Sequence, residues 1–528
     1  MLRRDVLRLG AASVAASLSS ATLHASIDAN KAASHPSPPS TVEMWGCMEL
    51  PLQGPSEGNP FREVTLTAEF QLEHRTVQVT GFYDGEGRYL VRFMPDQPGR
   101  WSYRTASNRP ALDGHTGSFA CVPATSPGNH GPVTTARQFH FQYADGTRYL
   151  PMGTTNYAYL FTTEDNAALV LQGIAKAKFN KTRICLLPKP LGADTSQQIL
   201  PFPRQGEGND LTRFHVAYFQ QAERRLLALQ QAGIEADLIL FHPYDAWGYK
   251  AMGAEADEFY LRYAVARLAA YRNVWWSVAN EYDLVKNKTM ADWDRAFRIL
   301  VAADPYGHLR SIHHSGPIYD NTRSWVTHAS LQRYDFEKTA ERRDAWRKPI
   351  LYDELQYEGD IDRRWGNLSA EEMTRRFWLA TVHGAYASHG EVFMAHHGEA
   401  SWSDAGALRG DAAPRLAFLR DTLQRFVRTG LAEVENSYYL CATESNDLLL
   451  YYFDYHRPAR YDFPLPTTGN YQASLVDPWQ MTTTELPGTF SGKSRIALPG
   501  RPYLAVLFHK VSDNHDPHTE AAKPEVLD

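Results

Sequence analysis

The chain of 528 residues is 43% hydrophobic and 22% charged, and its formal net charge at pH 7 is -6. At ~150 residues per domain this length predicts about three or four domains, and the hydrophobic share is ample for their cores. The net negative charge excludes nucleic acid as a partner, because phosphate binding needs a concentrated basic face. Beyond the first residues no stretch reaches ~18 consecutive apolar residues, so no membrane span is expected.

The first 25 residues have the pattern of an export signal. Arg3 and Arg4 supply a positive start, and the stretch 9–21 is small and apolar. The paired arginines resemble a twin-arginine signal, which implies that the folded protein is exported and becomes periplasmic or secreted. A general secretory leader is the alternative. Residues 26–40, with three prolines, are predicted to form a linker.

Residues 41–124 alternate between apolar and polar side chains in the period of two that β-strands produce. The stretches 87–93 and 100–104 show this pattern, and turn sequences such as Asp84-Gly85 separate the strands. We predict an N-terminal β-sandwich that supports the rest of the chain or binds sugar. Cys47 and Cys121 fall in its first and last strands, where they either pair or remain free thiols; four cysteines in so long a chain do not form a disulfide framework.

From residue 133 to residue 430 short apolar runs alternate with amphipathic helical stretches, for example 214–232, 255–271 and 371–389. This order is typical of βα units and a parallel sheet. Eight runs are strand candidates: 149–153, 181–187, 236–241, 274–279, 309–313, 325–330, 349–353 and 391–395. Eight units predict a (β/α)8 barrel of the α/β class. A doubly wound open sheet is the alternative, but no glycine-rich phosphate loop follows the first strand.

Alternation returns after a last helix at 415–428. The runs 438–441, 448–453 and 503–508 predict antiparallel strands of a small C-terminal β domain over residues 431–511. The polar residues 512–528 are predicted to be a disordered tail.

Two glutamates follow strands of the predicted barrel. The strand at 274–279 delivers Asn280 and Glu281, and the strand at 349–353 delivers Glu354. Barrel enzymes place their chemistry where strands end, so the topology aims both carboxyls at one rim. Hydrolysis of a glycosidic bond needs two such carboxyls, one protonated and one ionised, and Asn280 suits a hydrogen bond to the sugar 2-hydroxyl. The sequence therefore predicts a glycosidase.

The stretch Trp-Ser-Val-Ala-Asn-Glu at 276–281 resembles the strand-four signature of clan A glycoside hydrolases. The resemblance implies a retaining mechanism with Glu281 as acid/base and Glu354 as nucleophile. It also implies that Arg183, in the strand at 181–187, orients the nucleophile. An arginine inside an apolar strand needs a carboxylate partner, and a structural ion pair is the alternative for it.

Leu351 to Gly359 is similar to the strand-seven motif of a poorly characterised bacterial group. That group joins an N-terminal sandwich, an apiosidase-like barrel and a C-terminal β domain, and the stretches 54–61 and 92–95 resemble its first domain. The likeness covers roughly residues 41–510. The chain departs from many clan members at strand six, where Ser330-Leu331-Gln332 offers no tyrosine to the nucleophile and Tyr334 is a stand-in.

Further substrate contacts are expected from the loops that follow the strands. His242, His313 and His396 follow strands three, five and eight, and the alternative for each is an ordinary core or loop histidine. Rings that stack on a sugar face are expected among Tyr157, Trp247, Tyr357 and Trp402, with Trp402 favoured, and Gln332 adds a polar contact. Rival carboxyls are Asp353, Glu358, Glu391 and Glu399.

Two other functions compete with a β-glycosidase acting on an oligo- or polysaccharide. The histidines at the strand ends suggest a metal-dependent barrel hydrolase, but neither a His-x-His pair at strand one nor a His-Glu-x-x-His motif is present. A barrel that binds sugar without cleaving it usually lacks one of the two glutamates, and both are present here. We therefore expect a carbohydrate substrate and no metal or other cofactor. The sequence leaves the sugar, the linkage, and internal or terminal cleavage undetermined, together with the oligomeric state.

Overall fold

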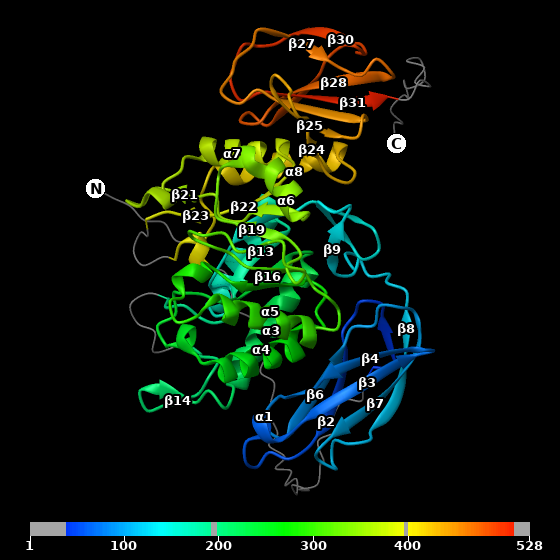
Figure 1. The fold of residues 1–528 in the computed structure, drawn as a ribbon, viewed down its shortest axis with the longest axis vertical. Coiled ribbons are helices and arrows are strands. Elements are labelled where there is room, and N and C mark those ends of the chain that lie inside the picture. The colour runs from blue at the N-terminus through cyan, green and yellow to red at the C-terminus, as the bar shows by residue number, and fades with distance from the viewer. Residues whose placement is uncertain (1–38, 192–197, 395–399, 512–528) are drawn as a thin grey trace, which may run out of the picture. The chain divides into compact units, whose positions relative to one another are not determined.

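The computed structural model describes residues 39–191, 198–394 and 400–511. The expected leader, nearly all of the linker and the expected tail lie outside these residues, and so does His396. The described chain runs from an N-terminal β region through a barrel to a C-terminal β domain (Figure 1).

The N-terminal region is a sandwich of two sheets. One sheet has the order β1 (Thr41–Glu43), β8 (Thr116–Val122), β7 (Gly99–Ser107), β3 (Leu66–Leu72), β4 (Arg75–Thr80), and the other β2 (Met48–Gln53), β6 (Arg88–Phe93), β5 (Phe82–Tyr83). The short helix α1 (Pro60–Glu63) follows β2. Buried side chains of both sheets form one core, in which the rings of Phe70 and Phe93 stack at 4.1 Å. Cys47 and Cys121 are free thiols, so the disulfide alternative is wrong.

A three-stranded sheet leads into the barrel. It comprises β9 (Val133–Ala136), β10 (His140–Tyr143) and β11 (Arg148–Tyr149). Phe141 and Tyr149 pack against Trp275, near the start of a barrel strand. This sheet therefore covers the end of the barrel at which the strands begin.

Eight parallel strands form the barrel, which confirms the predicted fold class. Their order is β18 (Arg310–Ser311), β17 (Val274–Ala279), β16 (Glu235–Phe241), β13 (Lys181–Cys185), β12 (Met152–Thr155), β22 (Tyr386–His389), β20 (Ile350–Tyr352), β19 (Ala329–Leu331). The edge strands β18 and β19 are not paired directly. Thr327, just before β19, closes the gap by donating its backbone N–H to the carbonyl of Arg310 at 2.9 Å.

Helices surround these strands (Figure 1). They are α2 (Glu164–Ala177), α3 (Val216–Gln231), α4 (Ala254–Leu268), α5 (Met290–Ala303), α6 (Thr339–Trp346), α7 (Ala370–Val382) and α8 (Ala412–Phe426). Thr163, Thr289 and Ser369 begin α2, α5 and α7 because their hydroxyls accept a backbone N–H of the first turn. The loops add the short strands β14 (Arg204–Gln205), β15 (Gly208–Asn209), β21 (Glu358–Gly359) and β23 (Glu391–Val392).

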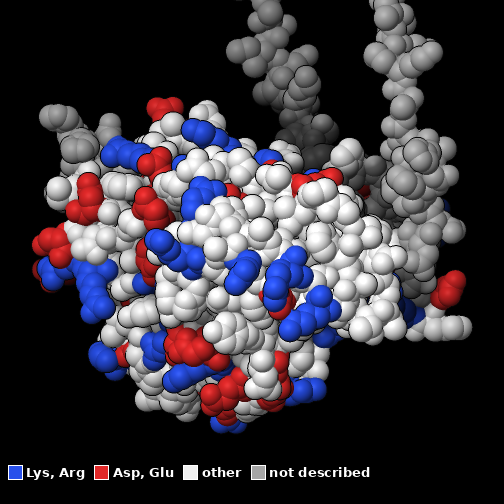
Figure 2. Space-filling model, turned by 90° about the horizontal axis from the view of Figure 1, so that it is seen from above, with Lys and Arg blue, Asp and Glu red and all other residues white. Residues whose placement is uncertain are grey.

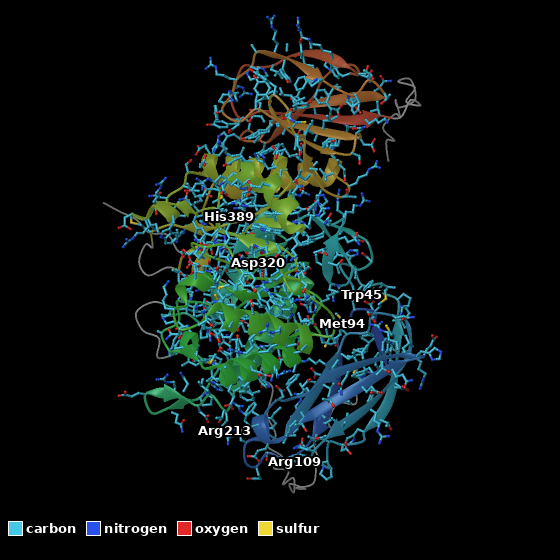
Figure 3. All side chains as sticks on the ribbon, viewed as in Figure 1. Trp45, Met94, Arg109, Arg213, Asp320 and His389 are labelled. Atoms are coloured by element: carbon cyan, nitrogen blue, oxygen red, sulfur yellow. The ribbon has the colours of Figure 1, made fainter. Side chains whose placement is uncertain are left out.

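The eighth barrel strand is the one whose predicted position is wrong. It occupies 386–389, inside the stretch predicted as helix. The described part of the predicted strand, 391–394, contains β23, which pairs with β21 outside the barrel. Helix α7 ends before Gly384, whose φ of 77° is the left-handed conformation that terminates helices. The strand then follows at once, and His389 stands at its end (Figure 3).

Charged side chains connect the sandwich to the barrel. Arg92 of β6 donates to Glu223 of α3 at 3.1 Å, and Arg267 of α4 donates to Glu223 at 2.5 Å and to Asp84 at 2.7 Å. Arg267 is fully buried. Beside this network Trp45 and Met94, labelled in Figure 3, pack against Ala270.

The C-terminal domain packs two sheets around one core. The larger has the order β24 (Ala432–Glu433), β25 (Leu440–Glu444), β26 (Leu448–Tyr452), β31 (Ala505–Val511), β28 (Asn470–Asp477), β29 (Thr482–Glu485), and the smaller pairs β27 (Arg460–Pro464) with β30 (Lys493–Ala497). Trp378 of α7 stacks on Tyr452 of β26 at 5.5 Å, which joins this domain to the barrel helices.

Both positive and negative residues are spread over the face seen in Figure 2. None of the helices within the described residues is long and apolar enough to cross a membrane.

Candidate active site

A cavity of about 600 Å³ lies where the barrel strands end. Residues that follow seven of the eight strands line it: Tyr157, Lys189, Tyr244, Glu281, Ser315, Gln332, Arg333, Tyr334, Glu354, Gln356, Tyr357 and Trp365. Both glutamates that the sequence singled out are among them. Side chains far apart in the sequence therefore converge on one cavity because parallel strands of a barrel end at one rim.

Glu281 directly follows β17 through Asn280 and is half-buried. Its φ of 44° is in the left-handed region, which few non-glycine residues occupy. Tyr244 donates its hydroxyl to Oε2 of Glu281 at 2.5 Å, and the amide of Gln332 donates to Oε1 at 3.2 Å. Both oxygens are thus held by side chains that line the cavity.

Glu354 lies two residues beyond β20 and is buried. Its Oε1 accepts from Nη1 of Arg183 at 3.1 Å and from the hydroxyl of Tyr157, and Nε2 of His313 lies 3.7 Å away. Burial raises the pKa of Glu354, and the negative charge of Glu281 raises it further, against the lowering effect of Arg183. The two carboxyls are therefore electrostatically coupled across the cavity.

Asn280 links the surroundings of the two glutamates. Its Oδ1 accepts from Nη2 of Arg183 at 2.6 Å, and its Nδ2 donates to the Tyr244 hydroxyl at 2.7 Å. A continuous chain of hydrogen bonds consequently runs from Glu354 through Arg183, Asn280 and Tyr244 to Glu281. The asparagine is fully buried, so its orientation is fixed by these partners.

A buried layer of charges lies beneath the cavity. Lys181 pairs with Asp353 at 2.8 Å and with Asp237 at 2.7 Å, and Asp353 also accepts from Ser330 and Ser388. Although burial opposes ionisation, Lys181 and Arg183 hold the pKa of Asp353 well below its usual range. Asp353 is thus fixed inside the barrel, and Glu354 is the carboxyl of this pair that reaches the cavity.

The tyrosines around the glutamates act as hydrogen-bond donors. Burial, followed by the negative charge of Glu354, raises the pKa of Tyr157, Tyr244 and Tyr357 well above the ordinary tyrosine value. The raised pKa favours the protonated hydroxyl, which is the form that donates a hydrogen bond. The hydroxyls of Tyr157 and Tyr357 also lie 3.1 Å apart, so Tyr357 extends the chain of hydrogen bonds from Glu354.

The structure brings most of the predicted site residues together. Glu281, Glu354, Tyr157, Tyr357 and Gln332 line the cavity. Arg183, Asn280 and His313 lie directly behind them in hydrogen-bond or ionic contact with the glutamates or their partners. His396 lies outside the described residues.

Three other predicted substrate contacts are not among the described residues that line the cavity. Trp402, the favoured stacking ring, is 1% exposed, and its indole N–H donates to Thr154 Oγ1 at 2.8 Å. His242 is buried beneath Tyr244, with Nε2 at 2.8 Å from the carbonyl of Leu187. Trp247 stacks against Tyr249 and is not among the described residues that line the cavity. Their sequence positions after barrel strands are as predicted, but Trp402 and His242 are buried by the packing of their loops.

Other cavity residues were not predicted. Tyr244 lies in the loop after strand three, two residues beyond His242. Its place directly after a barrel strand was the signal that could have identified it. Trp365 lies in the loop after strand seven, is 49% exposed and meets the ring of Tyr357 edge-on at 5.5 Å. The hydroxyl partner of Glu354 is Tyr157 of strand one and not Tyr334, whose ring instead lies under the guanidinium of Arg376 at 4.6 Å. Lys189 and Arg333 add positive charge to the cavity wall.

Those of the strand-end histidines that lie within the described residues do not form a group with metal-ligand spacing. Among the described residues, the group with metal-ligand spacing is Glu358, His389 and Glu391, whose ligand atoms lie within 4.8 Å of one another. Backbone N–H groups of residues 409–412 donate to both of its carboxylates. These glutamates thus fasten the start of α8 and do not line the cavity, which removes them as rivals of Glu281 and Glu354.

Comparison with known proteins agrees with this geometry. Residues 135–427 match the family model described as "Apiosidase-like, catalytic domain", and residues 41–108 and 438–509 match the domains of unknown function DUF5060 and DUF5605. A crystal structure of a candidate glycoside hydrolase from Bacteroides vulgatus ATCC 8482 is 36% identical, with a TM-score of 0.85 over 90% of this chain and 100% of that one.

A family 5 glycoside hydrolase from the same organism shares the fold at 15% identity, with a TM-score of 0.61 over 75% of this chain and 96% of that one. No curated protein matches the chain. The match of the catalytic-domain model covers more than half of the chain, and the relative from Bacteroides vulgatus is alike over nearly all of it. The chain therefore belongs to the family of glycosidases with an apiosidase-like catalytic domain.

Proposed function

We propose that this protein is a retaining glycosidase that cleaves β-glycosidic bonds of an oligo- or polysaccharide, with Glu354 as nucleophile and Glu281 as acid/base. The observation that carries this proposal is the difference between the two carboxyls at one cavity. Glu354 is buried against the guanidinium of Arg183, whereas Glu281 is half-buried and its side-chain partners among the described residues are the uncharged Tyr244 and Gln332. A fixed positive charge suits the ionised partner of such a pair.

In the first step a carboxylate oxygen of Glu354 forms a bond to the anomeric carbon as the glycosidic bond breaks. Glu281 gives its proton to the departing oxygen, so the leaving sugar departs as a neutral alcohol. In the second step Glu281, now ionised, takes a proton from water, and the resulting hydroxide displaces Glu354 from the anomeric carbon. Two inversions give net retention of configuration.

The surrounding groups have separate roles in this scheme. Arg183 and Tyr157 hold the attacking carboxylate in place, and Tyr244 holds Glu281. Asn280, fixed by Arg183 and Tyr244, suits a hydrogen bond to the sugar 2-hydroxyl, a contact that strengthens toward the transition state. Half-exposed Trp365 replaces Trp402 as the ring that stacks on a sugar face.

The volume of the cavity supports a saccharide substrate. About 600 Å³ lies within the range of pockets that enclose a small ligand. The paired arginines at positions 3 and 4 support the proposal that the enzyme is exported and meets its substrate outside the cytoplasm. Fractionation of expressing cells tests the location, and Arg3→Lys together with Arg4→Lys should retain the protein in the cytoplasm.

The stereochemistry of azide products tests the mechanism. Glu354→Ala cannot form the covalent intermediate, so azide entering the vacated space should convert an activated β-glycoside into the α-glycosyl azide. Glu281→Ala keeps the nucleophile and should still cleave aryl glycosides with good leaving groups. Azide then attacks the intermediate from the opposite face and gives the β-azide.

Each outcome identifies one carboxyl. Exchange of the two products between the variants would exchange the two roles. Nuclear magnetic resonance can identify the anomeric configuration of the first product of the wild-type enzyme. An inverted configuration would disprove the double displacement. Activity that survives both substitutions would place the chemistry elsewhere.

A further inference from the structure

Two cations line the catalytic cavity, and their charges are balanced differently. Lys189 pairs with Asp404, with Nζ and Oδ1 2.5 Å apart, and its ammonium lies 5.7 Å from the centre of the Tyr157 ring. The positive charge of Lys189 is therefore neutralised by the protein itself. Arg333 lines the same cavity and has no carboxylate within ion-pair distance among the described residues.

The contacts of Arg333 leave part of its guanidinium available. Nη1 donates to the carbonyls of Gln332 at 3.0 Å and of Ser315 at 3.4 Å, and Nη2 donates to the carbonyl of Gly316. These bonds fix the plane of the guanidinium between the loops after β18 and β19, but carbonyls carry no net charge. A guanidinium has five N–H donors, so donors remain beyond these three bonds. A half-buried arginine with an unbalanced charge favours an anion.

Arg333 lies in the loop after β19, next to a residue that contacts the proposed proton donor. Its neighbour Gln332 donates to Oε1 of Glu281, the proposed proton donor, and the guanidinium itself binds carbonyls of the loop after β18. Arg333 therefore belongs to the part of the cavity wall that also holds the proton donor. Tyr334, the next residue, also lines this wall and is half-exposed. The loop at 332–334 thus presents an amide, a cation and an aromatic ring in succession.

We infer that the sugar on the leaving-group side carries a negative charge and that Arg333 binds it, which makes an acidic glycan the substrate class. This inference rests on the proposed function. A planar guanidinium held by three carbonyls forms paired hydrogen bonds with a carboxylate or a sulfate. The anionic group is either a uronate carboxylate or a sulfate ester, and both present the same charged oxygens.

The inference is tested by the ratio of kcat/KM for an anionic substrate to kcat/KM for its matched neutral form. The probes are oligosaccharides from a uronate-containing polysaccharide and the same oligosaccharides after reduction of their carboxyls to alcohols. A second pair comprises a sulfated oligosaccharide and its desulfated form. We expect wild-type kcat/KM to favour the anionic member of one pair at least about 10-fold. Arg333→Met should lower this preference about 10- to 100-fold, the range of a charge-assisted hydrogen bond, and Arg333→Lys should restore part of it.

The ratio separates recognition of charge from loss of structure. If Arg333 only clamps the two loops, its removal slows both members of a pair alike and leaves the ratio unchanged. Arg323→Met is the matched control, because Arg323 is exposed on a nearby loop and pairs with Asp320, labelled in Figure 3. This control should leave the ratio as in the wild type.

The affinity for charged and neutral substrates can also be measured without turnover. Titration calorimetry of Glu354→Gln with each pair reads the preference without hydrolysis. Equal affinity for charged and neutral members, or an unchanged preference in Arg333→Met, would overturn the role of Arg333. Absence of hydrolysis by the wild type on every probe would instead count against the proposed function, while the calorimetric preference would still decide the inference.

Discussion

Tyr244 and Glu281 are joined by a hydrogen bond of 2.5 Å between the phenolic hydroxyl and Oε2 of the carboxyl. The two residues follow adjacent barrel strands, β16 and β17, so the bond fixes the proton donor relative to the rim of the barrel. Asn280 donates to the same hydroxyl, which leaves its proton directed at Glu281.

The first prediction concerns this bond. Tyr244→Phe frees the Glu281 carboxyl from one of its two side-chain partners, and kcat/KM should fall roughly 10- to 100-fold for substrates with poor leaving groups. Aryl glycosides with good leaving groups need little proton donation and should lose much less. A plot of rate against the acidity of the leaving group should therefore become steeper. Tyr249→Phe is the control, because its buried hydroxyl has no hydrogen-bond partner among the described residues.

Tyr157→Phe should give the opposite dependence on the substrate. The hydroxyl of Tyr157 donates to Oε1 of Glu354, and formation of the glycosyl-enzyme needs this carboxylate whatever the leaving group. We expect kcat/KM to fall roughly 10- to 100-fold for good and poor leaving groups alike. Tyr334→Phe removes a hydroxyl that bonds neither glutamate in the structure and should cost less. A larger loss in Tyr334→Phe than in Tyr157→Phe would contradict the assignment of Tyr157.

The acidic limb of the pH profile should report Glu354. The nucleophile must be ionised, so kcat/KM falls as the pH drops through the pKa of Glu354, which burial raises. Glu281, the proposed proton donor, is protonated and neutral at this limb. Glu281→Gln should therefore leave the acidic limb in place within about 0.5 pH unit and remove the basic limb, measured with an activated aryl glycoside. Loss of the acidic limb in Glu281→Gln, or a basic limb that persists, would contradict the two assignments.

Chelators should leave turnover intact. The proposed reaction uses two carboxyls and water, and the group with metal-ligand spacing, Glu358, His389 and Glu391, lies away from the described cavity lining. After dialysis against EDTA kcat/KM should stay within about twofold of its starting value. Complete loss of activity that returns with Zn²⁺ would favour the metal-dependent alternative.

Stability should depend on the buried network between the sandwich and the barrel. Arg267→Met leaves the buried carboxylate of Asp84 without its 2.7 Å partner and removes one of two arginines from Glu223. Loss of one member of a buried ionic network should lower the free energy of unfolding by about 3–5 kcal/mol in chemical denaturation. Arg262→Met, in the same helix, breaks an exposed pair with Glu258 and should cost under ~1 kcal/mol.

The fold class and the meeting of the two carboxyls at one rim could both be predicted from the amino-acid sequence. Periodic burial along each strand and helix is a local property, so eight βα units could be predicted without coordinates. Because barrel strands all end at one rim, Glu281 and Glu354 could be placed together from their positions after two strands. The eighth strand was misplaced because the apolar stretch from Glu391 onward resembles a strand more closely than Tyr-Ala-Ser-His, and because Gly384 was not recognised as the end of the helix.

The side chains that surround Glu281 and Glu354 could not be predicted from the sequence and are known from the three-dimensional structure. Loops after different strands meet at the rim, and their conformations depend on packing between residues far apart in the sequence. Tyr157 reaches Glu354 across 197 positions and Tyr244 reaches Glu281 from the adjacent strand, whereas Trp402 turns inward to donate its indole N–H to Thr154. Whether a ring faces a cavity or the core follows from such contacts, because a loop residue has no strand or helix period that fixes its direction.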